Sequence, residues 1–125
     1  MKTIIQHNQA DNEYYFEEGC FINELSNSDA DPAVSIAQAR VKPGETTRWH
    51  KLENTTERYV ILSGTGLAEV GQLSQTVKAG DTVIIAPGDK QRITNTGPDD
   101  LVFLAICSPR FREGNYIDLE DEITP

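Results

Sequence analysis

Apolar and polar residues alternate along most of the chain after residue 32, in short runs that turn residues separate. Six of these runs are predicted as strands, over residues 33–41, 58–64, 65–71, 81–88, 91–97 and 101–108. Glycine, proline or aspartate separates the runs at intervals of about 8–12 residues, which is typical of a sandwich or barrel. Apart from a helical turn or two in the tail, no segment shows an amphipathic helical pattern. The pattern predicts an all-β domain.

The predicted strands are apolar on both faces. In the run at 58–64, Tyr59 and Ile61 fall on one face and Val60 and Leu62 on the other. Two later runs show the same property. A small barrel needs an apolar inner face only, so the outer face is expected to be covered as well. Either the N-terminal segment or a second subunit covers it, and we expect a homodimer.

Composition narrows the choice of partners and compartment. A chain of 125 residues forms one domain, and a net charge of −9 argues against a nucleic-acid or anionic membrane partner. The two cysteines, Cys20 and Cys107, lack a paired-thiol spacing, which suits a reduced, cytoplasmic protein. A single disulfide between them is the alternative. The polar N-terminus does not resemble a secretory signal, and no apolar run approaches the ~18 residues of a membrane helix.

Two stretches carry polar residues and glycines at specific spacings: GETTRWHKLENTTERYVILSG at 44–64 and GDTVIIAPGDKQRITN at 80–95. Their pattern resembles the two-part signature of the cupin superfamily. Seven positions match its spacing, namely Gly44, His50, Glu57, Gly64, Gly80, Gly88 and Asn95. The resemblance implies a double-stranded β-helix (jelly-roll barrel). It places the barrel at residues 33–110, an N-terminal segment at 1–32 that packs on the barrel or on a partner subunit, and an acidic C-terminal tail at 111–125.

The chain departs from the cupin signature at its ligand positions. In metal-binding cupins three histidines and a glutamate hold one divalent ion, and here Leu52 and Gln91 occupy the positions of the second and third histidines. The proline of the second block has also moved by one place, to Pro87. Carried over by position, the candidate metal ligands are His50, Glu57 and Gln91.

The histidine count limits any metal site. The chain contains only His7 and His50, so even a site of two histidines and one carboxylate would need His7 from the chain end or from a partner. A glutamine carbonyl oxygen is a poorer ligand than imidazole for most transition metals. We therefore expect either no cofactor or a weakly held divalent metal.

Alternation predicts which side chains face the cavity of the barrel. If residues 46–52 are extended, Thr46, Arg48, His50 and Leu52 share a face. The resemblance turns the faces of His50, Glu57 and Gln91 inward. The predicted ligand-binding residues are Arg48, Leu52, Ile61, Gln91 and Ile93, and the predicted catalytic residues are His50, Glu57 and Tyr59. A mainly apolar cavity with a few converging polar groups is typical of a small-molecule site.

The same residues also have purely structural interpretations. Glu57 could pair with Arg48 or Arg58 on the rim, and Tyr59 could be a core residue. Cys107 ends an apolar strand and fits a core thiol better than a nucleophile.

Three functions remain open at this point. The first is a small-molecule isomerase, epimerase or cyclase that needs no metal, with His50 as general base tuned by Glu57, Tyr59 as acid and Arg48 as anchor. The second is a non-catalytic ligand sensor whose metal site has decayed. The third is a metal-dependent enzyme of the dioxygenase kind. The fold alone does not choose among these activities. We therefore favour a protein with a small-molecule pocket of unassigned activity, whose ligand is a polar or anionic metabolite.

Overall fold

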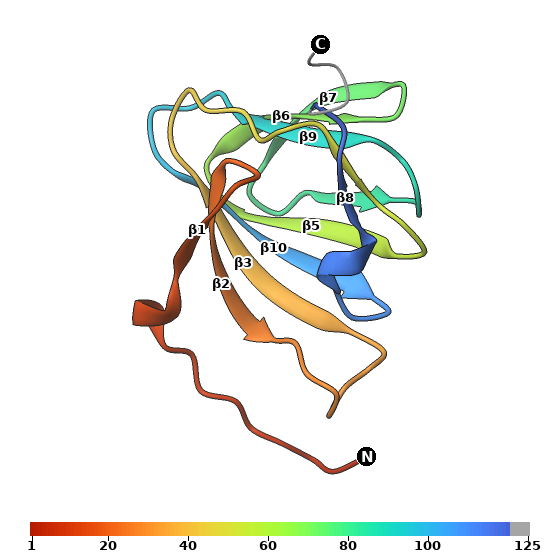
Figure 1. Ribbon diagram of the computed structural model, residues 1–125. Helices are drawn as coiled ribbons and strands as arrows, with labels where there is room; N and C mark the ends of the chain where they lie inside the picture. Colours follow the sequence, from red (N-terminus) through yellow and green to blue (C-terminus); the bar gives the residue numbers. More distant parts are fainter. Residues whose placement is uncertain (121–125) are drawn as a thin grey trace.

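The computed structural model describes residues 1–120, which form two antiparallel β-sheets (Figure 1). The six-stranded sheet has the order β1 (Tyr14–Phe16), β2 (Cys20–Ser26), β3 (Ser35–Val41), β10 (Leu101–Ser108), β5 (Thr56–Ser63) and β8 (Thr82–Ile85). The five-stranded sheet has the order β11 (Tyr116–Asp118), β4 (His50–Leu52), β9 (Gln91–Asn95), β6 (Thr65–Val70) and β7 (Leu73–Lys78). Short 3-10 helices, η1 (Ala10–Asn12) and η2 (Glu113–Asn115), precede β1 and β11. Within residues 1–120, no helix combines the length and the apolar character that a membrane crossing requires.

Strict alternation of side chains builds the core between the sheets. Along β5 every second side chain is buried, and β9 shows the same alternation. The inward residues of these two strands are Glu57, Tyr59, Ile61, Gln91, Ile93 and Asn95. Glu57 and Gln91 therefore face inward, as the resemblance implied. At the heart of the core, aliphatic side chains from both sheets pack together, with burial that favours the fold by about 25 cal/mol per Å² of apolar surface.

The topology brings the two signature stretches together. Strand β4 of the first stretch pairs with β9 of the second, and His50 lies opposite Gln91. Strand β10 lies between β3 and β5, so that segments far apart in sequence are neighbours. Because sheet pairing is non-local, the position of His50 depends on strands more than 40 residues away in sequence.

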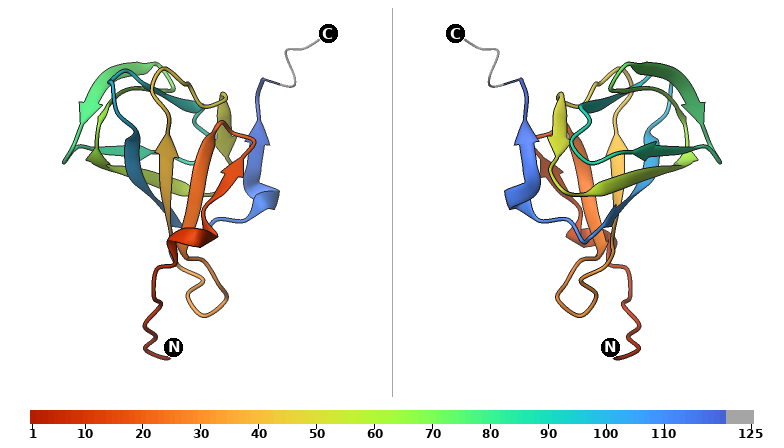
Figure 2. Two further views of the ribbon diagram at one scale, coloured as in Figure 1. Left: turned by 90° about the vertical axis from the view of Figure 1, so that its left-hand side faces the viewer. Right: turned by 90° about the vertical axis from the view of Figure 1, so that its right-hand side faces the viewer.

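The segments expected on either side of the barrel, at 1–32 and 111–125, both add strands to the sheets. Strand β2 pairs with β3, so this part of the N-terminal segment extends a sheet edge. In the C-terminal segment, β11 pairs with β4. Residues 1–9 have no regular structure (Figures 1 and 2). Asn8 accepts a hydrogen bond from Asn23 of β2 over 2.9 Å, and residues before it lie beside the segment that joins β2 to β3. Of the expected acidic tail, residues 121–125 lie outside the described residues.

The register predicted for residues 46–52 holds only at its end. Strand β4 begins at His50, and Thr47, rather than Thr46 or Arg48, is the buried residue before it. The Thr47 amide donates to the carbonyl of Ile93 in β9 over 2.9 Å, whereas the Arg48 amide donates to the carbonyl of Glu18 over 2.7 Å. Because neighbouring amides bond to different segments, residues 46–49 do not alternate as a regular strand does. Only His50 and Leu52 share the buried face that was predicted for residues 46–52.

Candidate functional site

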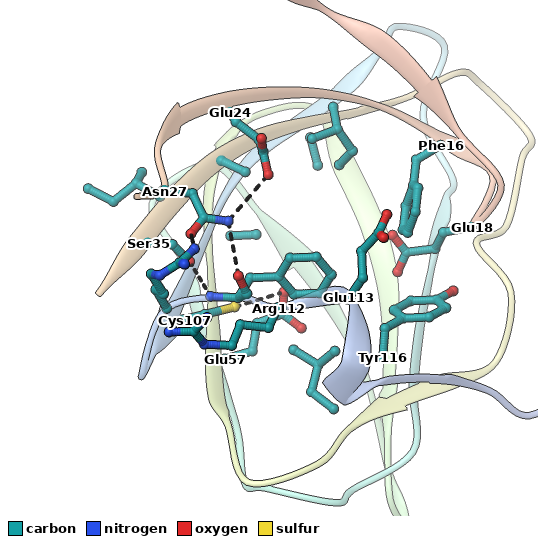
Figure 3. Close-up of a pocket in the computed structure, with 18 of the residues that line it drawn as sticks. Phe16, Glu18, Glu24, Asn27, Ser35, Glu57, Cys107, Arg112, Glu113 and Tyr116 are labelled. Atoms are coloured by element: carbon teal, nitrogen blue, oxygen red, sulfur yellow. Dashed lines mark hydrogen bonds between the residues drawn. The ribbon is translucent and has the colours of Figure 1, made fainter. Parts of the chain in front are cut away.

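A cavity of about 500 Å³ lies between the inner face of the six-stranded sheet and the C-terminal segment (Figure 3). Its walls come from β1 to β5, β10 and residues 110–116. Apolar side chains such as Ile22, Ala39 and Phe103 form much of the wall, and several charged groups interrupt it. The size and the mixed lining are those of a small-molecule site.

His50 lies in the wall of this cavity with both ring nitrogens engaged. Its Nε2 is 2.6 Å from Oε1 of Glu18, and its Nδ1 is 2.7 Å from the carbonyl oxygen of Arg48. A carbonyl oxygen and a carboxylate only accept hydrogen bonds, so both nitrogens donate and the ring is an imidazolium. Burial alone would lower the pKa of His50, but the Glu18 carboxylate outweighs it and raises the pKa to about 9.

Aromatic rings from both ends of the chain enclose the ion pair of His50 and Glu18. The ring of Tyr116 in β11 stacks on the imidazole at 5.1 Å between centroids, and Phe16 in β1 meets Tyr116 edge-on at 5.3 Å. The thiol of Cys20 donates to Oε2 of Glu18 over 3.4 Å. These contacts shield the pair from water and hold the imidazolium in one orientation.

Glu57 is the buried carboxyl group of the cavity, with 8% of its surface exposed. Its Oε2 accepts a hydrogen bond from the Cys107 thiol over 3.8 Å, whereas no atom of residues 1–120 hydrogen-bonds to its Oε1. Burial and the negative charge of Glu18 raise the pKa of Glu57 to about 7, and the nearby imidazolium of His50 opposes them only in part. Near neutral pH this carboxyl group can therefore both take and give a proton.

Tyr59 lines the cavity, but its hydroxyl group is already used. The hydroxyl donates to Oε1 of Gln91, and burial raises the pKa of Tyr59 well above its usual value. Gln91 itself does not line the cavity. The predicted ligand residues Ile61 and Ile93 likewise lie in the hydrophobic core instead of the cavity wall.

Arg48 also lies away from the cavity. Its Nε donates to Oδ2 of Asp118 in β11 over 2.8 Å, because the chain leaves the regular two-residue period before His50. Its role in the site is carried by its backbone carbonyl, which orients the imidazole. Of the predicted site residues, those that line the cavity are His50, Leu52, Glu57 and Tyr59. His7 is exposed and does not reach it.

The family model for the cupin domain matches residues 37–107. The chain belongs to the cupin family. An uncharacterised protein from Methanocaldococcus jannaschii is 34% identical over 100 residues, which cover 78% of this chain and 80% of that protein. The oxalate-binding protein of Thermotoga maritima is 37% identical over 71 residues, which cover 57% of this chain and 59% of that protein.

Solved structures share the same barrel. A predicted oxalate decarboxylase from Thermotoga maritima superposes with a TM-score of 0.76 at 25% identity, covering 85% of this chain and 99% of that one. The Streptomyces nucleoside dehydratase Pac13 has a TM-score of 0.76 at 13% identity, covering 93% of this chain and 92% of that one. At that identity the likeness to Pac13 shows only the fold. A Klebsiella pneumoniae protein with a double-stranded β-helix domain shares this fold, with a TM-score of 0.72 at 16% identity, covering 86% of this chain and 90% of that one.

The cupin metal position does not suit a metal in this chain. Among residues 1–120, no three histidine, cysteine, aspartate or glutamate side chains come together as a ligand group. His50 donates through both nitrogens, which leaves no lone pair for a metal, and Leu52 has no donor atom. The Oε1 of Gln91 is occupied by Tyr59. We therefore derive no step through a metal ion.

Several residues of this cupin site lie outside the signature stretches. Glu18 comes from the turn between β1 and β2, Tyr116 from β11, and Arg110 and Arg112 from the segment after β10. The sequence offers no periodic signal for them, because a turn or an irregular segment does not specify where its side chains point. The prediction that residues 1–32 pack on the barrel was the only indication that residues outside the signature stretches, such as Glu18, contribute to the site.

Proposed function

We propose that this cupin binds a small polar metabolite in the cavity and catalyses a proton transfer at Glu57, as in an isomerase, epimerase or cyclase that needs no metal. The observation that carries the proposal is the buried Glu57 carboxyl group. The Glu57 side chain lines the cavity, its Oε1 is buried and unpaired within residues 1–120, and its pKa lies near 7. A general base or acid works best when its pKa is close to the working pH.

The arrangement reverses the roles that the sequence suggested for the two central residues. His50 is protonated and donates through both nitrogens, so it is not free to act as general base. Its fixed positive charge instead stabilises negative charge that develops on a ligand beside Glu57. The hydroxyl group of Tyr59 is bound to Gln91, so we assign the proton transfer in both directions to Glu57.

Deuterium exchange tests this proposal without knowledge of the natural substrate. A panel of small hydroxy- and oxo-compounds is incubated with the protein in D₂O, and proton NMR follows loss of the C–H signals next to carbonyl groups. The wild type is expected to accelerate exchange in at least one compound. Glu57→Gln, which keeps the side-chain shape, is expected to reduce that rate by at least about 100-fold, in line with the usual contribution of general base catalysis.

A matched control separates catalysis from general effects of charge. Glu45→Gln removes an exposed carboxylate that does not line the cavity, and it should leave the exchange rate within about twofold of wild type. Exchange that persists in Glu57→Gln, or no exchange in any compound of the panel, would refute proton transfer at Glu57.

A non-catalytic ligand sensor is the second candidate. It is favoured by the number of polar groups that satisfy one another inside the protein, namely His50 with Glu18 and Tyr59 with Gln91. A sensor would be stabilised by a ligand without turning it over. A ligand at 100 times its Kd raises the unfolding free energy by about 2.7 kcal/mol, so thermal melting would detect it while the NMR spectra stay unchanged.

A further inference from the structure

Two buried polar atoms without hydrogen-bond partners within residues 1–120 belong to residues of the same cavity. They are Oε1 of Glu57 and Nε of Arg110. A buried donor or acceptor that stays unpaired destabilises the folded state, and most such groups have a partner when the protein is at work. One atom is a donor and the other belongs to a carboxyl group, so a single ligand with two kinds of polar group would satisfy both.

The rest of the Arg110 guanidinium is held in place by the protein. Nη1 donates to Oδ1 of Asn27 over 2.8 Å, and Nη2 donates to Oδ1 of Asp29 over 2.7 Å. The side chain is 15% exposed. With these two groups fixed, the remaining Nε–H has a set direction. It can only donate, so its partner must be an acceptor such as a carboxylate oxygen.

A second guanidinium lies at the same cavity. Arg112 lines it, is exposed, and has no carboxylate within ion-pair distance among residues 1–120. Two arginines two residues apart, one fixed and one free to move, can together hold one carboxylate group. Glu24 and Glu113 also line the cavity, so a doubly charged phosphate would meet more repulsion there than a singly charged carboxylate.

We infer that the ligand of this cupin is a small hydroxy- or oxo-carboxylate, whose carboxylate binds Arg110 and Arg112 while its hydroxyl or carbonyl group meets Glu57. This assignment of the substrate class rests on the proposed function. It orients the molecule along the cavity, with the anionic end at the arginines and the carbon that exchanges a proton at the Glu57 end. The inference differs from proton transfer at Glu57 because it concerns only what the cavity recognises.

Matched probes test the recognition of the carboxylate. Gluconate, sorbitol and glucamine share one carbon chain and differ at the end group, which is a carboxylate, a hydroxymethyl or an aminomethyl group. Glycerate, glycerol and 3-amino-1,2-propanediol form a shorter set, with glycerol 3-phosphate as the phosphate comparison. Calorimetry and thermal melting of the full-length protein at millimolar probe concentration are expected to show binding of gluconate or glycerate, at least about tenfold tighter than the matched alcohol or amine.

Two arginine variants and one control locate the binding. Arg112→Gln removes an exposed side chain without an ion pair, so its fold is preserved, and it should weaken carboxylate binding about tenfold. Arg110→Lys keeps the charge but removes the Nε–H, and a similar loss is expected. Arg92→Gln is the control, because Arg92 pairs with Glu69 on the other sheet and does not line the cavity. It should bind the probe as the wild type does.

The outcomes separate this inference from the proposed function. Tighter binding of an alcohol, an amine or the phosphate, no binding of either carboxylate, or equal carboxylate binding by wild type and both arginine variants would overturn the carboxylate assignment. Carboxylate binding that Glu57→Gln retains, without deuterium exchange in any protein, supports the recognition of a carboxylate while it refutes proton transfer.

Discussion

At the scale of single residues, one carboxylate decides the chemistry of the site. Glu18 holds Nε2 of His50 at 2.6 Å and converts a residue of nearly neutral pKa into a fixed cation. The same negative charge contributes to the raised pKa of Glu57. Two titratable groups in one cavity are thus pushed to different roles, a permanent cation and a carboxyl group that changes protonation near neutral pH.

Glu57 and His50 together predict that the protein loses stability as the pH rises from about 5 to 9. Each binds a proton more tightly in the folded than in the unfolded state, with pKa values of about 7 against 4.5 for Glu57 and about 9 against 6.5 for His50. The stabilising effect of Glu57 is complete below pH 4.5 and is lost up to pH 7, and that of His50 is complete below 6.5 and lost up to 9. Each loss is on the order of 3 kcal/mol.

Urea unfolding at a series of pH values measures this dependence. Glu57→Gln is expected to flatten the curve between pH 5 and 7 and to keep the decline above pH 7. Glu113→Gln serves as control and should keep both. A wild-type stability that is constant or rises across this range would contradict the assigned protonation states.

At the scale of elements, tight turns between strands set the shape of the barrel. Gly64 joins β5 to β6 with a φ of 89°, a conformation that favours glycine. A Cβ atom at this position would lie 2.8 Å from the carbonyl oxygen of Asp100 and 2.9 Å from Cα of Leu101. Both are backbone atoms at the start of β10, so the close approach of two chain segments requires glycine here.

Gly64→Ala is therefore expected to destabilise the protein by about 2–4 kcal/mol, because backbone strain and a backbone collision add together. Gly80 is the matched control. Its φ is 95°, but a Cβ atom there would meet nothing within 4 Å, so Gly80→Ala should cost only about 1 kcal/mol. Chemical denaturation of both variants gives the comparison, and equal costs would show that the collision at Gly64 is relieved by a small shift.

At the scale of the whole molecule, an apolar face remains on the outside of the six-stranded sheet. Val60 and Leu104 lie opposite each other on neighbouring strands, and Ile84 and Ile106 flank Arg58 on either side. Ile84 is 72% exposed. Since β2 extends the edge of this sheet instead of crossing its outer face, a second subunit is the partner that we expect there.

Light scattering coupled to size exclusion tests the homodimer, which stays a prediction. Ile84→Lys places a charge on this apolar face, at the edge strand β8, and should yield a monomer. Leu73→Lys is the control, since Leu73 is 68% exposed but lies on β7 of the other sheet. A wild-type protein that is monomeric at all accessible concentrations would refute the homodimer. A dimer that only Leu73→Lys disrupts would place the interface on the other sheet.

The sequence by itself determined the fold and the cavity positions of four predicted site residues, His50, Leu52, Glu57 and Tyr59. Alternation within a strand and glycines at turns are local properties, so they can be recognised in the text of the chain. The same rule failed at Arg48, because the regular strand begins only at His50. It also could not separate Glu57, in the cavity wall, from Ile61, in the closed core of the same strand.

Only the tertiary structure decided what these residues can do. Glu18, Tyr116 and Arg110 reach the cavity from a turn, a terminal strand and an irregular segment, and their approach depends on how the two ends of the chain pack onto the barrel. Protonation follows from this packing, because burial and the distance between charges set a pKa, and neither is encoded by the identity of His50 or Glu57 alone.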